Sequence, residues 1–203
     1  MARPPYHQER SKSSYRRPYG GSKPPKKRIL IVCEGKKTEP NYFKAFRITS
    51  VHVDVEGGNE QCPDRIVEYG MKKGKGYDLV WSVFDKDENK PQNFNRAFEL
   101  IRNRRKYKIA YSNEAFELWY LLHFHYYNTG ISRSRYKGML TRLLGHRYKK
   151  NNPDMYQKLL SRQSEAIRNA RRLLESYQTF DPLNNNPSTT VVDLVEELNK
   201  YVD

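Results

Sequence analysis

Two short runs of mostly apolar residues dominate the first half of the chain. Residues 29–33 (ILIVC) form one run, and residues 77–84 (YDLVWSVF) form the other. Largely apolar runs of this length are typical of strands that are buried on both faces. The alternating pattern of residues 50–55 (SVHVDV) and the short run at 107–112 (YKIAYS) predict two further strands.

Segments with helical periodicity separate these four predicted strands. Thr38 can cap a helix in which Pro40 occupies the first turn and aromatic residues recur at helical spacing. Residues 63–74 begin with Pro and end with Gly, and residues 93–105 carry an apolar stripe, so both predict helices. The alternation of strands and helices across residues 28–112 predicts a four-stranded parallel sheet that is covered by helices on both sides.

Residues 113–203 are predicted to form a helical extension that packs on this core. The extension begins with a strongly aromatic segment, and residues 154–177 then place apolar side chains along one face. Residues 184–202 predict a loop and a final helix, with Thr190 and Asp193 in the register of a capping box.

The first part of the chain differs from the rest in composition. Residues 1–27 are rich in Pro, Gly, Ser, Arg and Tyr and show no apolar periodicity, which predicts a disordered basic tail. The expected fold class is therefore α/β, with a tail at 1–27, an α/β core at 28–112 and the helical extension at 113–203.

The balance of charge narrows the class of partner. The chain of 203 residues has a formal net charge of +15, and residues 131–153 form a basic stretch without a single acid. Such an excess predicts a polyanionic partner, with nucleic acid favoured over an anionic membrane. A basic surface that merely keeps the protein in solution is the alternative interpretation.

Membrane and secretory classes are not favoured. No apolar run reaches membrane-spanning length, and the start of the chain lacks the pattern of a secretory signal. The two cysteines, Cys33 and Cys62, have no metal-ligand spacing and no pairing pattern. We therefore expect a soluble cytoplasmic protein without a membrane partner.

Carboxylates follow directly after the two most apolar strands. Glu34 and Gly35 come after the first run, and Asp85, Asp87 and Glu88 come after the other. The carboxyl ends of parallel strands open onto the ligand crevice, so these acids are expected to converge there. Oxygen ligands suit hard divalent cations, and a cation relieves the repulsion among carboxylates. The pattern predicts a site for Mg²⁺ or Mn²⁺, with a simple polar loop as the alternative.

Four ordered motifs resemble those of the RloB-like family of restriction- and phage-defence loci, including its abortive-infection (AbiLii-like) members. They occupy residues 29–46 (ILIVCEGKKTEPNYFKAF), 80–89 (VWSVFDKDEN), 111–124 (YSNEAFELWYLLHF) and 186–198 (NPSTTVVDLVEEL). The first two also resemble the Toprim domain of topoisomerases, bacterial primases and OLD-type nucleases. That domain has Glu-Gly after its first strand, Asp-x-Asp after its third, and a four-stranded parallel sheet. One departure is Glu114, with Ala115, where Pro-Cys or a similar pair is expected.

This resemblance implies a metal-dependent nuclease that cleaves DNA or RNA in phage defence, regulated by a partner AAA-type ATPase. It implies that Glu34 is a metal-linked acid or base and that Asp85 and Asp87 hold Mg²⁺ or Mn²⁺. Glu39 extends the motif as in OLD-like nucleases and would reach a second metal, or it is a first-turn acid favoured by the helix dipole. The alternative function is a non-catalytic nucleic-acid-binding subunit of a defence complex.

The aromatic segment after residue 112 holds a further candidate. Glu117 lies among aromatic residues, where a carboxylate is costly unless it is used, so it is a candidate to complete the metal site. Ser112 and Asn113 are expected to cap the helix that contains it. His123 and His125 have no further metal ligands at a suitable spacing, so a structural role is favoured for both over a zinc site.

The basic stretch is a candidate for binding the phosphate backbone, because its cations alternate with Tyr136 and Tyr148 for stacking. A solvated charged surface is the alternative. The candidate nucleic-acid-binding residues are Lys36, Lys37, Arg133, Arg135, Lys137, Arg142, Arg147, Lys149 and Lys150.

Overall fold

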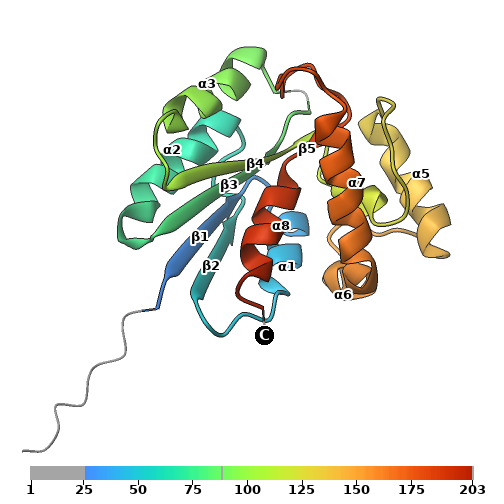
Figure 1. Cartoon of the computed structure of the whole chain (residues 1–203), viewed down its shortest axis with the longest axis horizontal. Coiled ribbons are helices and arrows are strands. Elements are labelled where there is room, and N and C mark those ends of the chain that lie inside the picture. The colour runs from blue at the N-terminus through green and yellow to red at the C-terminus, as the bar shows by residue number, and fades with distance from the viewer. Residues whose placement is uncertain (1–25, 88, 203) are drawn as a thin grey trace, which may run out of the picture.

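The computed structural model describes residues 26–87 and 89–202 (Figure 1). The predicted tail therefore lies almost entirely outside the described residues, as does Glu88. A five-stranded sheet forms the centre of the fold, in the order β2-β1-β3-β4-β5. Its strands are β1 (Arg28–Cys33), β2 (His52–Gly57), β3 (Leu79–Asp85), β4 (Tyr107–Asn113) and β5 (Ser188–Thr189).

The α/β class and the four predicted strands are confirmed, since β1, β2, β3 and β4 pair in parallel. The fifth strand was not predicted. It is two residues long, and it pairs antiparallel with the end of β4 through Ser112 and Thr189. The sheet is therefore mostly parallel, and its last strand comes from the segment that was predicted to be a loop.

Burial on both faces explains the continuous apolar runs. In β1, Ile29, Ile31 and Cys33 join the hydrophobic cluster on one face of the sheet. Leu30 and Val32 join a separate cluster on the other face. Because successive side chains of a strand point to opposite faces, a strand that is covered on both sides needs an apolar residue at every position.

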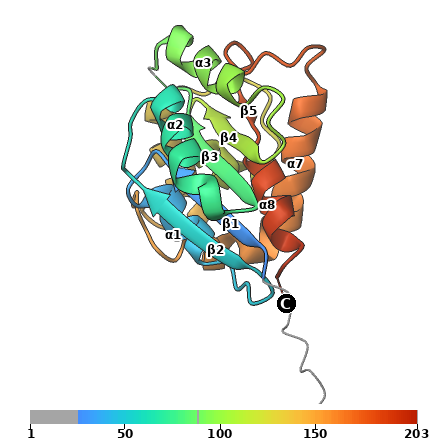
Figure 2. The same ribbon diagram turned by 90° about the vertical axis from the view of Figure 1, so that its left-hand side faces the viewer.

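Helices cover both faces of the sheet. α2 and α3 pack on one face, and α1 and α8 lie on the other, with α5, α6 and α7 beyond α8 (Figures 1 and 2). The helices are α1 (Thr38–Lys44), α2 (Pro63–Lys73), α3 (Pro91–Ile101), α4 (Glu117–Leu122), α5 (Arg133–Leu144), α6 (Met155–Leu159), α7 (Gln163–Glu175) and α8 (Val191–Asn199). Within residues 26–87 and 89–202, none of them combines the length and apolarity needed to cross a membrane.

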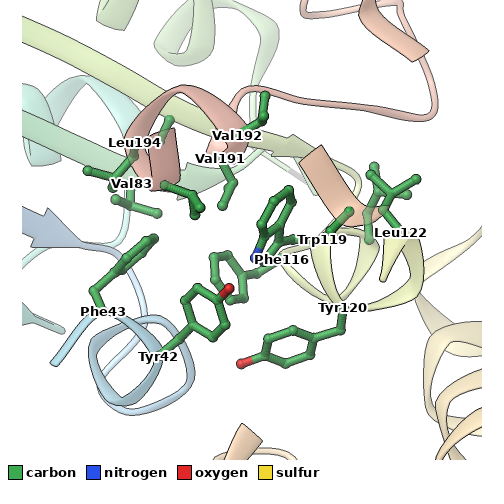
Figure 3. Packing of buried hydrophobic residues seen from close by; sticks show 14 of the residues in the cluster. Tyr42, Phe43, Val83, Phe116, Trp119, Tyr120, Leu122, Val191, Val192 and Leu194 are labelled. Carbon is green, nitrogen blue, oxygen red and sulfur yellow. The ribbon is translucent and has the colours of Figure 1, made fainter. Parts of the chain in front are cut away.

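A continuous aromatic core joins the sheet to the helical extension (Figure 3). Tyr42 of α1 lies with its ring centroid 5.8 Å from that of Phe116, just before α4, and 5.3 Å from that of Tyr156 in α6. The rings meet edge to face, the geometry that their quadrupoles favour. Trp119 of α4 is fully buried in the same cluster, so α4 belongs to the interior of the fold.

The capping roles predicted for Thr38, Ser112, Asn113 and Thr190 are wrong. Thr38 is the first residue of α1, and its hydroxyl donates to the Asn151 side chain instead. Ser112 and Asn113 belong to β4, and the Ser112 hydroxyl lies 2.9 Å from that of Thr189 in β5. Thr190 precedes α8, but its hydroxyl accepts a hydrogen bond from the backbone N–H of Tyr111 at 3.0 Å and makes no cap. Tertiary contacts, chiefly pairing with the unpredicted strand, therefore replace the local hydrogen bonds that the sequence pattern suggested.

Candidate active site

The ends of β1 and β3 place Glu34 beside Asp85. The parallel register sets Cys33 opposite Val83, and the Glu34 N–H donates to the Val83 carbonyl oxygen at 2.9 Å. The Glu34 carboxylate then accepts a hydrogen bond from the backbone N–H of Asp85 at 3.0 Å. The structure thus brings these two predicted site residues together at the carboxyl edge of the sheet, where parallel sheets bind ligands.

A third carboxylate, that of Glu39, joins them in a pocket of about 350 Å³. We call this the acidic pocket; it is lined by Glu34, Gly35, Lys36, Lys37, Thr38, Glu39, Asp85, Arg133, Lys150 and Asn151. A Cβ at Gly35 would overlap the Glu39 carboxylate, so the glycine makes room for this acid in the first turn of α1. Three acids and four cations therefore border one small volume.

Burial and mutual repulsion raise the pKa values of the acids in this pocket. Burial, and then the charges of Glu39, Glu34 and Glu117, raise the pKa of Asp85 well above its usual range, and the charge of Arg133 opposes them. Burial is also the main cause that raises the pKa of Glu34 and the pKa of Glu39. A divalent cation would relieve both effects, since it favours the charged form of every carboxyl group near it.

Asp87 lies outside the acidic pocket. The alternation of β3 ends at Asp85, and Asp87 adopts a φ of 36°, in the left-handed region that Asp tolerates better than most residues. Its carboxylate forms an ion pair with the Arg133 guanidinium at the start of α5. Glu114 supports this pair, because its carbonyl oxygen accepts from the Asp87 N–H and its carboxylate accepts from the Arg133 N–H.

The side chains of the acidic pocket are of the type that binds a hard divalent cation, but they are not arranged around a single ion position. Glu34, Glu39 and Asp85 offer the carboxylate oxygens that Mg²⁺ and Mn²⁺ prefer, and such ions keep several water ligands. No group of three His, Cys, Asp or Glu side chains among the described residues is placed to hold one ion. Asp87 would join the set only by leaving Arg133.

Glu117 occupies a neighbouring pocket of about 470 Å³. We call this the basic pocket; it is lined by Glu117, Arg133, Tyr136, Lys137, Arg147, Tyr148, Lys149 and Lys150. Glu117 is the first residue of α4 and is only 7% exposed. Its carboxylate accepts a hydrogen bond from the Tyr148 O–H at 3.2 Å. Arg133 and Lys150 line both pockets, so the two are adjacent.

The predicted nucleic-acid-binding residues divide into four groups. Lys36 and Lys37 border the acidic pocket alone; Lys137, Arg147 and Lys149 border the basic pocket; Arg133 and Lys150 border both. Arg135 and Arg142 are exposed on α5 and line neither pocket. The cations of the stretch are therefore not equivalent, and most of them surround one concave site.

The prediction that Tyr136 and Tyr148 are free to stack on bases is wrong. They are 2% and 4% exposed, so their rings support the floor of the basic pocket instead of standing out from its surface. Burial raises the pKa of both phenols. Tyr136 lies on the buried side of α5, whose outer side carries cations, whereas Tyr148 is buried in the loop that follows this helix.

His123 has the structural role that was favoured for it. The side chain is fully buried, and its Nδ1 donates to the Trp119 carbonyl oxygen at 2.8 Å. Burial lowers its pKa to about 4, so the ring is neutral at physiological pH. His125 is exposed, and no cluster of three metal-ligating side chains includes either histidine in the described part of the chain.

Asn151 is a residue of the site that the sequence pattern did not single out. Its side-chain oxygen accepts from the Thr38 hydroxyl at 2.8 Å, and its carbonyl oxygen accepts from the Asn41 amide at 3.2 Å. These bonds tie α1 to the loop before α6 and hold Lys150 at the edge of the acidic pocket. The Asn-Asn-Pro sequence at 151–153 indicates a turn, but it contains no sign of a partner more than a hundred residues away.

Comparison with known proteins identifies one family. A family model described as RloB-like protein matches residues 29–198, which is most of the chain and includes every residue of both pockets. Neither the curated proteins nor the solved structures contain a match to this chain.

Proposed function

The chain belongs to the RloB-like protein family, and from this premise we propose that it is a metal-dependent nuclease that hydrolyses phosphodiester bonds in DNA or RNA. The acidic pocket carries the proposal, because Glu34, Glu39 and Asp85 meet there at the carboxyl edge of the sheet. Buried carboxylates with raised pKa values destabilise a fold unless they are used, and such groups gather at functional sites. The Toprim-like interpretation of the core is part of this proposal.

Glu34, Glu39 and Asp85 are the residues that would hold Mg²⁺ or Mn²⁺. The bound ion would polarise the phosphoryl group and lower the pKa of an attacking water. The Asp85 N–H orients the Glu34 carboxylate at the edge of the acidic pocket, and an oriented carboxylate can act as a general base. Glu34 is therefore suited to take the proton of that water.

The cations around the acidic pocket orient the substrate. Lys36 and Lys37 approach from the loop after β1, whereas Arg133 and Lys150 approach from the helical extension. A phosphodiester that lies between them has positive charge on two sides, which offsets its repulsion from the carboxylates. Arg133 also neutralises Asp87, so its position depends on how much charge the pocket holds.

A cleavage assay tests this function. Wild-type protein is incubated with single-stranded DNA, duplex DNA and RNA, in Mg²⁺, in Mn²⁺ and in chelator. We expect cleavage only with metal, and a loss of about 100-fold or more in Glu34→Ala and in Asp85→Ala. Glu99→Gln, which removes an exposed acid on the outer surface of α3, is the matched control and should cleave normally. Full activity in both pocket variants would exclude the acidic pocket as the catalytic site.

A second candidate function is a non-catalytic nucleic-acid-binding subunit. The pairing of Asp87 with Arg133 favours it, because that carboxylate is already neutralised inside the protein. We also propose a role in phage defence with a partner AAA-type ATPase, so the assay includes that ATPase and its nucleotide. Binding without cleavage under all these conditions would support the second function.

A further inference from the structure

The basic pocket has a size and a lining that select its ligand. Its volume of about 470 Å³ lies within the range of small-molecule sites, whereas a duplex presents its phosphates on a broad convex surface. Its walls carry five cations: Arg133, Lys137, Arg147, Lys149 and Lys150. A concave site with this lining suits one anionic group of limited size.

The floor of the basic pocket carries a carboxylate, in contrast to the cations of its walls. Glu117 is 7% exposed there and can only accept hydrogen bonds when it is ionised, and Tyr148 already donates one to it. A phosphate at this depth would be repelled by the carboxylate. A ligand that fits must therefore place N–H donors at the floor and negative charge at the rim.

A single nucleotide meets both requirements. The exocyclic amino groups of cytosine, adenine and guanine are hydrogen-bond donors that a Glu carboxylate accepts, and the phosphate is an anion for the rim. In a duplex these groups are paired and stacked, so a base reaches such a pocket only from a single strand or after leaving the stack. The lining thus distinguishes unpaired from paired nucleic acid.

The two pockets are connected by their shared cations. Arg133 and Lys150 line both, so a strand with one base in the basic pocket would carry its adjoining phosphate to the edge of the acidic pocket. We propose that the basic pocket receives one unpaired nucleotide, with its amino-bearing base toward Glu117, and so directs the site to single-stranded nucleic acid. This inference rests on the proposed nuclease function for its substrate class, but its test measures binding alone.

The experiment uses the full chain in chelator, so that no strand is cut, and follows the fluorescence anisotropy of labelled oligonucleotides. The probes are oligo(dC), oligo(dT), an RNA strand of mixed sequence, and a DNA duplex of equal length. We expect single strands to bind about tenfold or more tightly than duplex. We also expect oligo(dC) to bind more tightly than oligo(dT), because the cytosine amino group can meet the carboxylate, whereas the N3–H of thymine lies between two carbonyl oxygens that the carboxylate repels.

Two variants locate the effect. The double variant Lys137→Ala with Arg147→Ala removes two cations from the walls of the basic pocket. It should bind single strands about tenfold more weakly, and its binding should depend less on salt concentration. Arg104→Ala with Arg105→Ala removes the same charge from an exposed surface outside both pockets and should change binding less than about twofold. Glu117→Gln keeps an acceptor for the Tyr148 O–H and should abolish the preference for oligo(dC) over oligo(dT).

Each outcome bears on one proposal. Duplex binding as tight as single-strand binding, or equal losses in the two double variants, would overturn the single-nucleotide inference. An unchanged base preference in Glu117→Gln would overturn it as well. If single strands bind as expected but are never cut with metal and ATPase present, the nuclease proposal fails and the binding site stands. If cleavage occurs while the variants of the basic pocket bind normally, the nuclease proposal stands and the single-nucleotide inference fails.

Discussion

The backbone N–H of Asp85 donates a hydrogen bond to the Glu34 carboxylate at 3.0 Å, so the main chain of β3 orients the side chain that follows β1. The bond depends on the parallel register of the two strands, which sets Cys33 opposite Val83. It fixes Glu34 in place without neutralising it or Asp85. Their relative position is therefore a property of the sheet, while their charge is left for a ligand to balance.

Asp85→Asn is expected to stabilise the protein at neutral pH. Burial raises the pKa of Asp85, so the folded state keeps a proton that the unfolded chain releases near pH 4. Stability is therefore lost as pH rises from that value through the folded pKa, and Asn avoids the loss. We expect Tm to increase by about 3 °C at pH 8, for a gain of about 1 kcal/mol, and the difference to shrink toward pH 4. An equal or lower Tm at pH 8 would show that the charge of Asp85 is already compensated.

Divalent cations should stabilise the wild-type protein through the same carboxylates. A ligand that binds only the folded state at 100 times its Kd adds about 2.7 kcal/mol to the free energy of unfolding. Thermal unfolding of chelator-treated protein should therefore shift upward in millimolar Mn²⁺ or Mg²⁺. The shift should be lost in Asp85→Asn and kept in the surface control Glu99→Gln. No shift in the wild type would argue against a metal site in the acidic pocket.

The central sheet and the meeting of Glu34 with Asp85 could be predicted, because both follow from local patterns and one general rule. Continuous apolar runs mark doubly covered strands, and the carboxyl ends of parallel strands share one edge. The strand that contains Thr189 could not be predicted. Two residues are too few to show a period, and its partner Ser112 lies 77 positions earlier in the chain.

The lining of the basic pocket depends on tertiary packing, which the sequence pattern does not specify. Helical periodicity predicts that one side of α5 is buried, but it does not show that the buried side meets α4 near Glu117. Tyr148 and Asn151 follow α5 in a loop, where no periodicity operates. Their contacts with Glu117 and Thr38 join segments separated by 31 and 113 positions.

The free energy of unfolding should fall in mild acid because His123 must then bind a proton on unfolding. Burial lowers its pKa to about 4, whereas an unfolded His binds a proton below about pH 6.5. Stability is present above the unfolded pKa and is lost as pH falls toward 4, by about 3 kcal/mol in total. Urea denaturation across this range should show a smaller loss in His123→Gln than in the wild type. The exposed His125→Gln is the control and should retain the full loss; equal behaviour of both variants would contradict the assignment.

Arg133→Ala should strengthen metal binding while it weakens the binding of nucleic acid. The guanidinium pairs with Asp87 and opposes the raised pKa of Asp85, so it acts as an internal cation that competes with a bound metal for the same negative charge. Its removal should tighten Mn²⁺ binding by about threefold to tenfold, which corresponds to an interaction of up to one pKa unit. The change is measured by titrating free Mn²⁺ against chelator-treated protein. Arg135→Ala removes an exposed charge of the same helix and should leave Mn²⁺ affinity unchanged. Weaker Mn²⁺ binding in Arg133→Ala would mean that Arg133 positions the carboxylates for the metal, and competition between the two cations would be ruled out.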